Sequence, residues 1–415
     1  MNLPVLLAAA VEHAAVLLTL FIIIAAAKVM AEVFERLRQP AVVGEILAGV
    51  LIGPSVLGWV EPSELISIVA EVGVIFLLFM VGLETKPKDI FRVGKKAAMV
   101  GMLGVILPFV AGYAIASFWG GSFLESMFIG AALVATSVGI TARVLGSMGL
   151  LEKETSRIIL GAAVVDDILG LIILSIVSGL GNGGVRIVSL AKTAGLAILF
   201  TVVVGLFGSR IITLLAPKIQ NLHLNKPFFN IGLVLCFGLS VISLYFGVAA
   251  IIGAFLAGMA LAEATENNHK MHQLTAGVTE FLVPFFLVHI GMQLNLQVFR
   301  DSSVLVLAIV VTVAAVLTKF IGGGLGAWGM SRREMAQVGI GMVPRGEVGI
   351  VVAQIGLGMA AISEQFFAAV LFMAVGTTLI APPLIEYFYA EDRDIDGIED
   401  VIVETDISED FMRLG

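Results

Sequence analysis

The chain has 415 residues, of which 59% are hydrophobic and 13% are charged, and its mean hydropathy is +1.06. About a quarter of the residues in a soluble globular protein are charged, so the composition excludes that class and predicts an all-α polytopic membrane protein. The net charge of −8 arises from residues 390–415, which hold ten acidic residues and two arginines, so the rest of the chain is neutral and offers no basic surface for nucleic acid. The single cysteine, Cys236, excludes a disulfide framework and a thiolate metal site.

Thirteen apolar segments are predicted to span a membrane, by a criterion of about 20 residues that is relaxed where glycine and proline interrupt them. The first segment lacks a basic region and a small-residue cleavage site, so it is interpreted as a span and not as a signal peptide. The transmembrane domain covers residues 1–389, and the acidic tail, 390–415, is expected to be a disordered, solvated end, with partner binding or sensing of cytoplasmic pH as the alternative. In chain order, the approximate limits of the spans are 7–34, 40–57, 64–84, 95–117, 123–147, 157–180, 187–212, 228–246, 247–264, 273–294, 303–329, 333–358 and 364–389.

Basic residues concentrate on one side of the predicted bundle. The loops on that side, with the tail and two helix ends, hold 18 of the 24 lysines and arginines, whereas the opposite side holds three. The positive-inside rule therefore predicts a multi-pass protein of the cell membrane with its N-terminus outside and its C-terminus in the cytoplasm. The loops of the basic side are 35–39, 85–96, 148–157, 213–227, 265–272 and 330–333.

The sequence resembles itself at a shift of 209 residues. GEILAGVLIG at 44–53 matches GAFLAGMALA at 253–262, and the same shift carries Glu71 onto Glu280. The matching units are spans 2–6 and spans 9–13. Corresponding spans are seven apart in the chain, and because seven is odd they cross the membrane in opposite directions. The two units are therefore inverted with respect to each other. Many secondary transporters are built from such inverted repeats.

Two spans in matching repeat positions contain helix breakers. Span 5 contains ALVATSVGITARVL, in which Thr136 and Ser137 precede Gly139, and span 12 contains QVGIGMVPRGEVGIVV, with five glycines and prolines within eleven residues. Such a run does not fit an undisturbed helix. Non-helical backbone in the middle of a membrane is tolerated where it lines a cavity or is buried in protein. Its carbonyl groups, which no longer accept helical hydrogen bonds, coordinate cations. The sequence therefore predicts two crossing broken helices, with an ion site near Thr136 and Ser137.

Ionisable residues lie in the middle of the apolar spans. Asp166 and Asp167 interrupt the run 157–180, where one carboxylate costs about 2.5–3.5 kcal/mol to insert. Adjacent helical residues point about 100° apart, so the two carboxylates meet different neighbours. Lys319 in span 11 requires a carboxylate, and either aspartate is a candidate partner.

Other charges are expected to neutralise the same region. Arg345 and Glu347 lie in the broken part of span 12, where they are expected to compensate half-helix dipoles or to pair with acids from other spans. Glu71 and Glu280 are repeat-related, which suggests a structural role such as caging Arg345 or capping a broken helix end, with transport chemistry as the alternative. His289 is interpreted as a satisfied core histidine, with pH sensing as the alternative.

Several segments and the lysine of span 11 resemble the monovalent cation:proton antiporter-2 family, in particular bacterial sodium/proton antiporters of the NapA and GerN type. The resemblance covers residues 30–385 and implies a homodimeric elevator antiporter without a cofactor. Its core would comprise about 95–180 and 303–389, and the remainder would form the dimerisation scaffold. It further implies that Asp167 carries Na⁺ and the proton, and that Asp166 pairs with Lys319. The segments are QPAVVGEILAGVLIGP, FLLFMVGLE, ALVATSVGITARVLG, RIILGAAVVDDILGLI and GMVPRGEVGIVVA.

The chemistry of a buried carboxylate predicts exchange independently of the resemblance. Na⁺ and H⁺ compete for one desolvated carboxylate, and either one neutralises the site so that it crosses a low-dielectric barrier. The prediction is secondary active Na⁺/H⁺ antiport in pH homeostasis, with Li⁺ as a further candidate, an electrogenic stoichiometry and no enzymatic activity. K⁺/H⁺ antiport is the main alternative, and a cation channel or an intramembrane aspartyl protease is a remote one.

Overall fold

The structure is a computed structural model that describes residues 3–37, 39–181, 187–266, 268–294 and 296–413. The regular elements in these ranges are all helical, as expected where backbone groups find no water to bond. In chain order they are α1 (Leu3–Arg36), α2 (Ala41–Ile52), α3 (Glu64–Leu83), α4 (Pro87–Phe118), α5 (Phe123–Val134), α6 (Val138–Ser147), α7 (Glu154–Gly181), α8 (Ile187–Gln220), α9 (Pro227–Tyr245), α10 (Ala250–Thr265), α11 (His269–Met292), the 3-10 helix η1 (Leu296–Arg300), α12 (Ser302–Gly326), α13 (Arg332–Gly341), α14 (Glu347–Gly358) and α15 (Glu364–Arg413).

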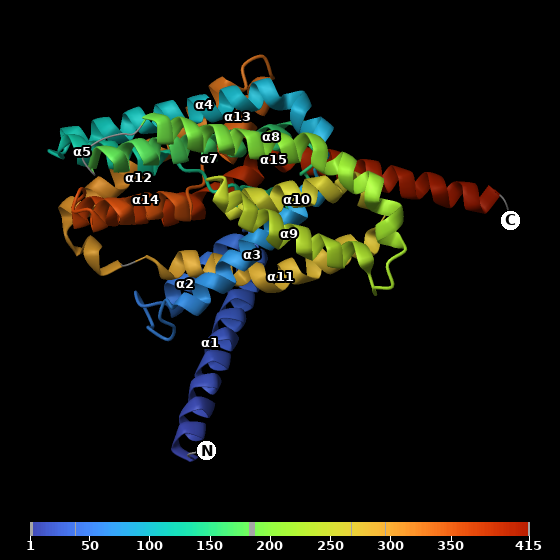
Figure 1. Cartoon of the computed structure of the whole chain (residues 1–415), viewed down its shortest axis with the longest axis horizontal. Coiled ribbons are helices and arrows are strands. Elements are labelled where there is room, and N and C mark those ends of the chain that lie inside the picture. The colour runs from blue at the N-terminus through green and yellow to red at the C-terminus, as the bar shows by residue number, and fades with distance from the viewer. Residues whose placement is uncertain (1–2, 38, 182–186, 267, 295, 414–415) are drawn as a thin grey trace.

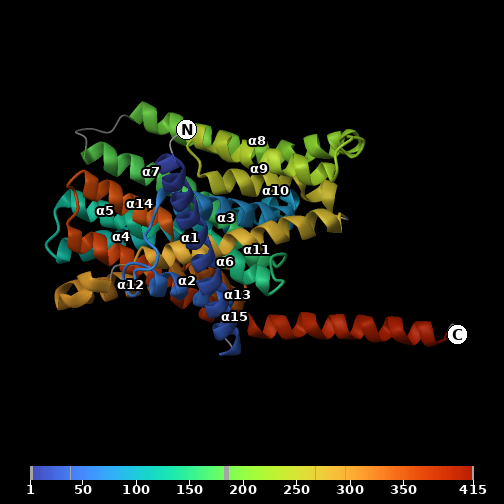
Figure 2. The same cartoon turned by 90° about the horizontal axis from the view of Figure 1, so that it is seen from below.

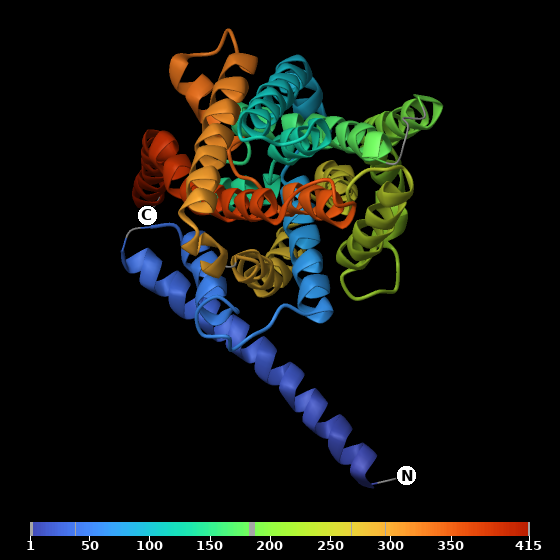
Figure 3. The same ribbon diagram turned by 90° about the vertical axis from the view of Figure 1, so that its left-hand side faces the viewer.

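Most helices run along one common direction and fall into two groups by their contacts (Figure 1). The core bundle, α4–α7 with α12–α15, is organised around α4, which packs against α5, α7 and α12. The scaffold bundle, α1–α3 with α8–α11, is organised around α3, which packs against α10 and α11. Figure 2 shows α8 and α9 along the edge opposite α12 and α15, and Figure 3 shows α1 at the periphery with its N-terminal end projecting away.

Ten helices of the described part are long and apolar enough to cross a membrane, and three shorter apolar helices accompany them. An all-helical polytopic membrane fold is therefore confirmed. The count of thirteen spans stays a prediction, in which α5 with α6, and α13 with α14, each stand for one span.

Both predicted helix interruptions are present. Residues 135–137 separate α5 from α6, and residues 342–346 separate α13 from α14. Pro344 explains the second break, because proline lacks a backbone donor and disfavours helical backbone at the residue before it. The first break has no proline. Thr136 and Ser137 carry hydroxyl groups that compete with helical backbone hydrogen bonds.

Glycines allow two close helix crossings in the scaffold bundle. A Cβ atom at Gly49 of α2 or at Gly291 of α11 would lie 2.0 Å from a backbone carbonyl oxygen of the facing helix. At the crossing of α10 with α3, the corresponding distances are 2.1 Å for Gly258 and 2.2 Å for Gly82. The shift of 209 residues found in the sequence therefore relates the two crossings. It carries residue 49 onto residue 258, and residue 82 onto residue 291.

Gly49→Ala is expected to destabilise the protein by about 1–3 kcal/mol, because the added methyl group forces α2 and α11 apart. The measurement is the thermal unfolding midpoint in detergent. Gly238→Ala in α9 is the matched control, since a Cβ there meets no atom within 4 Å and alanine favours a helix. Equal midpoints for the two variants would contradict the close crossing.

The acidic tail differs from the expectation of a disordered end. α15 continues without a break from the core bundle to Arg413, and its C-terminal half projects from the molecule (Figure 1). Between residue 390 and the end of α15 at Arg413 the chain contains no proline and a single glycine, Gly397, so little in the sequence opposes continuation of the helix. The side chains from residue 393 onward lie outside the described part.

Candidate functional site

The two interrupted helices cross at their breaks. The backbone N–H of Ser137 donates to the carbonyl oxygen of Pro344, with an N···O distance of 2.8 Å. The hydroxyl of Thr141 in α6 donates to the carbonyl oxygen of Gly341, the last residue of α13, at 2.6 Å. A Cβ atom at Gly346 would lie 2.8 Å from the Ser137 side chain, so glycine is required for this approach. Four helix ends therefore meet inside the protein.

Arg345 closes the C-terminal end of α5. Its side chain is fully buried, and Nη1 donates to the carbonyl oxygens of Val134 and Ala135 at 2.8 and 3.0 Å. Nη2 donates to the carbonyl oxygen of Ala315 in α12 at 3.2 Å. The last carbonyls of a helix carry a partial charge of about −0.5, which the guanidinium compensates. Of the two roles expected for Arg345, this geometry corresponds to dipole compensation.

Two threonines that sequence reasoning missed hold the second break in place. The backbone N–H of Arg345 donates to Oγ1 of Thr377 at 3.1 Å, and Oγ1 of Thr378 donates to the carbonyl oxygen of Arg345 at 2.8 Å. Both threonines lie on α15 and are fully buried. The available signal was the adjacent hydroxyl pair in the apolar run AVGTTLIAPP, since the freed backbone of a broken helix requires such partners.

A buried ion pair joins α7 to α12. Nζ of Lys319 donates to Oδ1 of Asp166 at 2.8 Å, and neither side chain is exposed. Gly104 of α4 leaves room for the ammonium group, because a Cβ there would lie 3.3 Å from Nζ. The sequence left two candidate partners for this lysine, and the structure pairs it with Asp166.

Asp167 is half-buried on another face of α7. Gly170, three residues later on the same side of the helix, approaches Val134, the last residue of α5. Asp167 is thereby directed toward the region of the first break. In that break Thr136 is buried, and its Oγ1 has no hydrogen-bond partner among the described residues. An orphaned hydroxyl beside a carboxylate-bearing helix fits a cation ligand.

Glu71 and Glu280 do not lie at this site, so the expectation that they cage Arg345 is corrected. Glu71 is exposed, and Oε1 of Glu280 lies 3.0 Å from Nζ of Lys28, with both side chains substantially exposed. Equivalent positions in a repeat do not fix which way a side chain points, and these two turn away from the crossing. Glu347 begins α14, but its side chain lies outside the described part of the chain.

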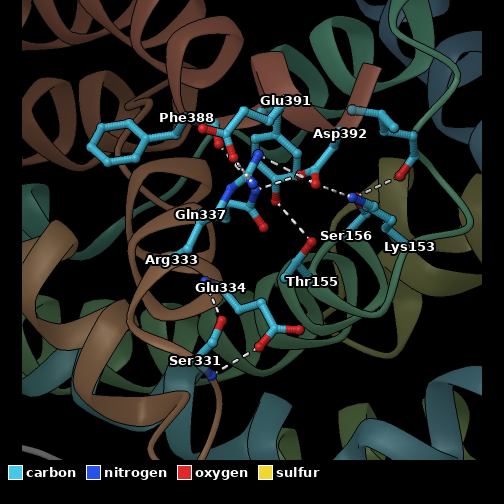
Figure 4. A network of polar contacts seen from close by, with 12 residues as sticks. Lys153, Thr155, Ser156, Ser331, Arg333, Glu334, Gln337, Phe388, Glu391 and Asp392 are labelled. Carbon is cyan, nitrogen blue, oxygen red and sulfur yellow. Dashed lines mark hydrogen bonds and ion pairs between the residues drawn. The ribbon is translucent and has the colours of Figure 1, made fainter. Parts of the chain in front are cut away.

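A second polar network lies where α7 and α13 begin and α15 leaves the core bundle (Figure 4). The nearly buried Asp392 accepts from Lys153 at 2.6 Å and from Gln337 at 2.5 Å, and it lies 3.4 Å from Arg333. Arg333 also pairs with Glu391. Sequence reasoning did not predict this network, which fastens α15 to α7 and α13, the helices that carry the aspartates and the second break.

An all-helical membrane bundle in which two broken helices cross beside a buried ion pair defines a secondary transporter rather than an enzyme. The chain belongs to the family described as sodium/hydrogen exchanger, transmembrane, whose model matches residues 17–388. The resemblance noted in the sequence is thereby confirmed.

Two relatives and one solved structure illustrate this membership. The Na(+)/H(+)-K(+) antiporter GerN of Bacillus cereus is 35% identical over 377 residues, which cover 90% of this chain and 96% of the relative. The high-affinity Na(+)/H(+) antiporter NhaS3 of Synechocystis is 34% identical and covers 89% of each chain. The structure of the sodium proton antiporter MjNhaP1 from Methanocaldococcus jannaschii aligns with a TM-score of 0.62 at 16% identity, covering 92% of this chain and 98% of that chain. The last likeness concerns the fold alone.

Proposed function

We propose that the chain is a secondary active Na⁺/H⁺ antiporter in which Asp167 is bound alternately by a cation and by a proton. The proposal is supported by a half-buried carboxylate on α7, a helix that packs against α5 and α6 on either side of the first break, and by the buried pair of Lys319 with Asp166. The names of GerN and NhaS3, which cover about nine tenths of this chain, support the same activity.

The bound cation would take oxygen ligands from the carboxylate of Asp167, the hydroxyl of Thr136 and the region of Ser137. Unwound backbone in broken helices supplies further carbonyl oxygens for such ions. Na⁺ or H⁺ at the carboxylate neutralises the site, and a neutral site passes a low-dielectric barrier far more easily than a charged one. Exchange is then obligatory, because the empty site does not cross. The transported ions are substrates, and the mechanism requires no cofactor.

The architecture we assign to this activity has thirteen spans, an outer N-terminus and a cytoplasmic C-terminus. The paired glycine crossings of α2 with α11 and of α10 with α3 support inverted repeats, since the repeat shift exchanges them. The core bundle would move as an elevator against a scaffold bundle that forms a homodimer. This division is supported by the helix packing, since each helix has its most extensive contacts with helices of its own bundle.

K⁺/H⁺ antiport is the second candidate, because the relative GerN is named a Na(+)/H(+)-K(+) antiporter. The discriminating experiment uses proteoliposomes with an imposed pH gradient that quenches an acridine dye. Na⁺ is expected to dissipate the gradient at the lowest concentration, followed by Li⁺, with little response to K⁺. Dissipation by K⁺ below the concentration required for Na⁺ would transfer the assignment to K⁺. The absence of a response to any of the three would refute antiport.

The two remote alternatives, an intramembrane aspartyl protease and a cation channel, require properties that differ from those of this site. An aspartyl protease needs two carboxylates that share one proton, whereas Asp166 is paired with Lys319 and is adjacent to Asp167 on one helix. A cation channel requires a conductance far above the turnover of a carrier, which single-channel recording would detect.

A further inference from the structure

A cavity of about 530 Å³ lies between the scaffold bundle and the core bundle. The scaffold contributes Ser67 of α3 with His289 and Gln293 of α11, and the core contributes Gln354 of α14 and Leu371 of α15, among others. The lining is apolar apart from one hydroxyl, two amides and one imidazole. His289 is therefore the only titratable residue that lines this cavity in the described part of the chain.

The inner end of the cavity lies about one helical turn from the crossing of the broken helices. Ile350, which lines the cavity, follows Gly346 of the crossing by four residues. On the scaffold side, His289 follows Phe286 by three residues, and the ring of Phe286 lies 3.8 Å from the place where Gly139 of α6 would carry a Cβ. Residues three or four apart share a helix face and are separated by about 5 Å along the axis.

The opposite side of the first break is closed by apolar packing. Val138, which begins α6, lies among Leu78 of α3, Leu160 of α7 and Phe255 of α10, where the remaining space is about 10 Å³. A space of this size holds one water molecule at most. In this conformation the cavity that His289 lines therefore approaches the crossing, whereas apolar side chains leave little space on the other side of the first break.

One ring nitrogen of His289 lacks the partner that a structural histidine would have. Its Nδ1 is buried without a hydrogen-bond partner among the described residues, which corrects the interpretation of a satisfied core histidine. Among the described residues, no other titratable group lines the cavity to hold or to neutralise a proton there. The helices packed around it carry titratable residues that do not line it, among them Lys28 of α1, Glu45 of α2, Glu64 and Glu71 of α3, Glu280 of α11 and Glu364 at the start of α15.

We propose that this cavity is the outer vestibule through which cations reach the crossing, and that protonation of His289 restricts their access. Imidazole is the side chain that changes charge between about pH 5 and 8. A unit charge about 10 Å from a cation, in a surround with an effective dielectric constant of about 20–30, lowers the cation occupancy about tenfold. Acidification of the vestibule side thus reduces cation binding beyond direct competition at Asp167. The inference rests on the proposed antiport function.

The first test compares the wild type with His289→Gln, which keeps a polar side chain but cannot become charged. The apparent KM for Na⁺ is measured with the pH varied only on the vestibule side. Between about pH 8.5 and pH 5.5, the KM of the wild type is expected to rise about tenfold more than that of the variant, with equal values at the alkaline end. His272→Gln is the control, since His272 lies at the other end of α11 near the carbonyl oxygen of Thr265, and it should follow the wild type.

Superimposable profiles for the wild type and His289→Gln would overturn the inference while leaving the antiport function intact. Loss of cation-driven proton movement in the wild type itself would instead refute the antiport function. The two failures are therefore distinguishable in one assay.

The second test uses the single native cysteine, Cys236, which is fully buried and is replaced in the background variant Cys236→Ser. His289→Cys in this background is treated from the vestibule side with a positively charged or a negatively charged methanethiosulfonate of similar size. The positive adduct is expected to raise the KM for Na⁺ about tenfold at alkaline pH, and the negative adduct is expected to leave it unchanged or lower it. Equal inhibition by both reagents, or no labelling from this side, would contradict an electrostatic vestibule.

Discussion

Asp167→Asn is expected to abolish cation-driven proton movement while the protein keeps its fold. An amide does not release a proton in the physiological range and adds no negative charge against a bound cation, so both half-cycles lose their carrier. The ion pair of Lys319 with Asp166 remains intact in this variant, so the buried charges of the core stay compensated. Reconstituted protein is assayed for Na⁺-induced and Li⁺-induced dissipation of a pH gradient, and folding is followed by the unfolding midpoint and the elution profile.

Glu61→Gln serves as the control for this substitution. Glu61 is an exposed carboxylate in the segment between α2 and α3, so the same chemical change there should leave transport at the level of the wild type. Na⁺-dependent proton movement in Asp167→Asn at more than a few per cent of the wild-type rate would remove Asp167 from its assigned role. Asp166 would then be the remaining carboxylate at the centre of α7.

Local chemistry made parts of this site predictable from the sequence. Pro344 and the surrounding glycines act on their own backbone, so the second helix break follows from residue types alone. A lysine in the middle of an apolar span requires a carboxylate, and the pair of aspartates on α7 offered one. The sequence did not decide between Asp166 and Asp167 without the resemblance, because that choice depends on the rotation of α7 relative to α12.

Features that depend on helix rotation or on distant helix ends were missed or wrongly predicted. Glu71 and Glu280 were assigned to the centre from their repeat positions, but both face away from it. The network around Asp392 joins the beginnings of α7 and α13 to the middle of α15, three segments that lie far apart in the sequence. No local sequence pattern predicted this network, because the same residue types also occur in a solvated loop and in an acidic tail. The same holds for His289, whose vestibule exists only where two bundles meet.

Removing either charge of the pair formed by Lys319 and Asp166 is expected to destabilise the protein by about 3–5 kcal/mol, because the remaining charge is then buried without a counterion. Lys319→Met and Asp166→Asn each leave such a charge. The double variant leaves none, and replacement of a buried ion pair by uncharged residues is often neutral or stabilising. The double variant is therefore expected to be more stable than either single variant, with a coupling of about 2 kcal/mol or more in the cycle.

Transport by the double variant tests what the pair contributes beyond stability. If Lys319 gives up a proton whenever the cation loads, two protons exchange for each Na⁺ and net charge moves. Without the lysine one proton remains, at Asp167, so the double variant is expected to be electroneutral while the wild type is electrogenic. Reversal potentials in proteoliposomes measure this stoichiometry. An electroneutral wild type would show that Lys319 does not couple a second proton to transport. If the losses of stability in the two single variants simply add in the double variant, the two charges do not compensate one another.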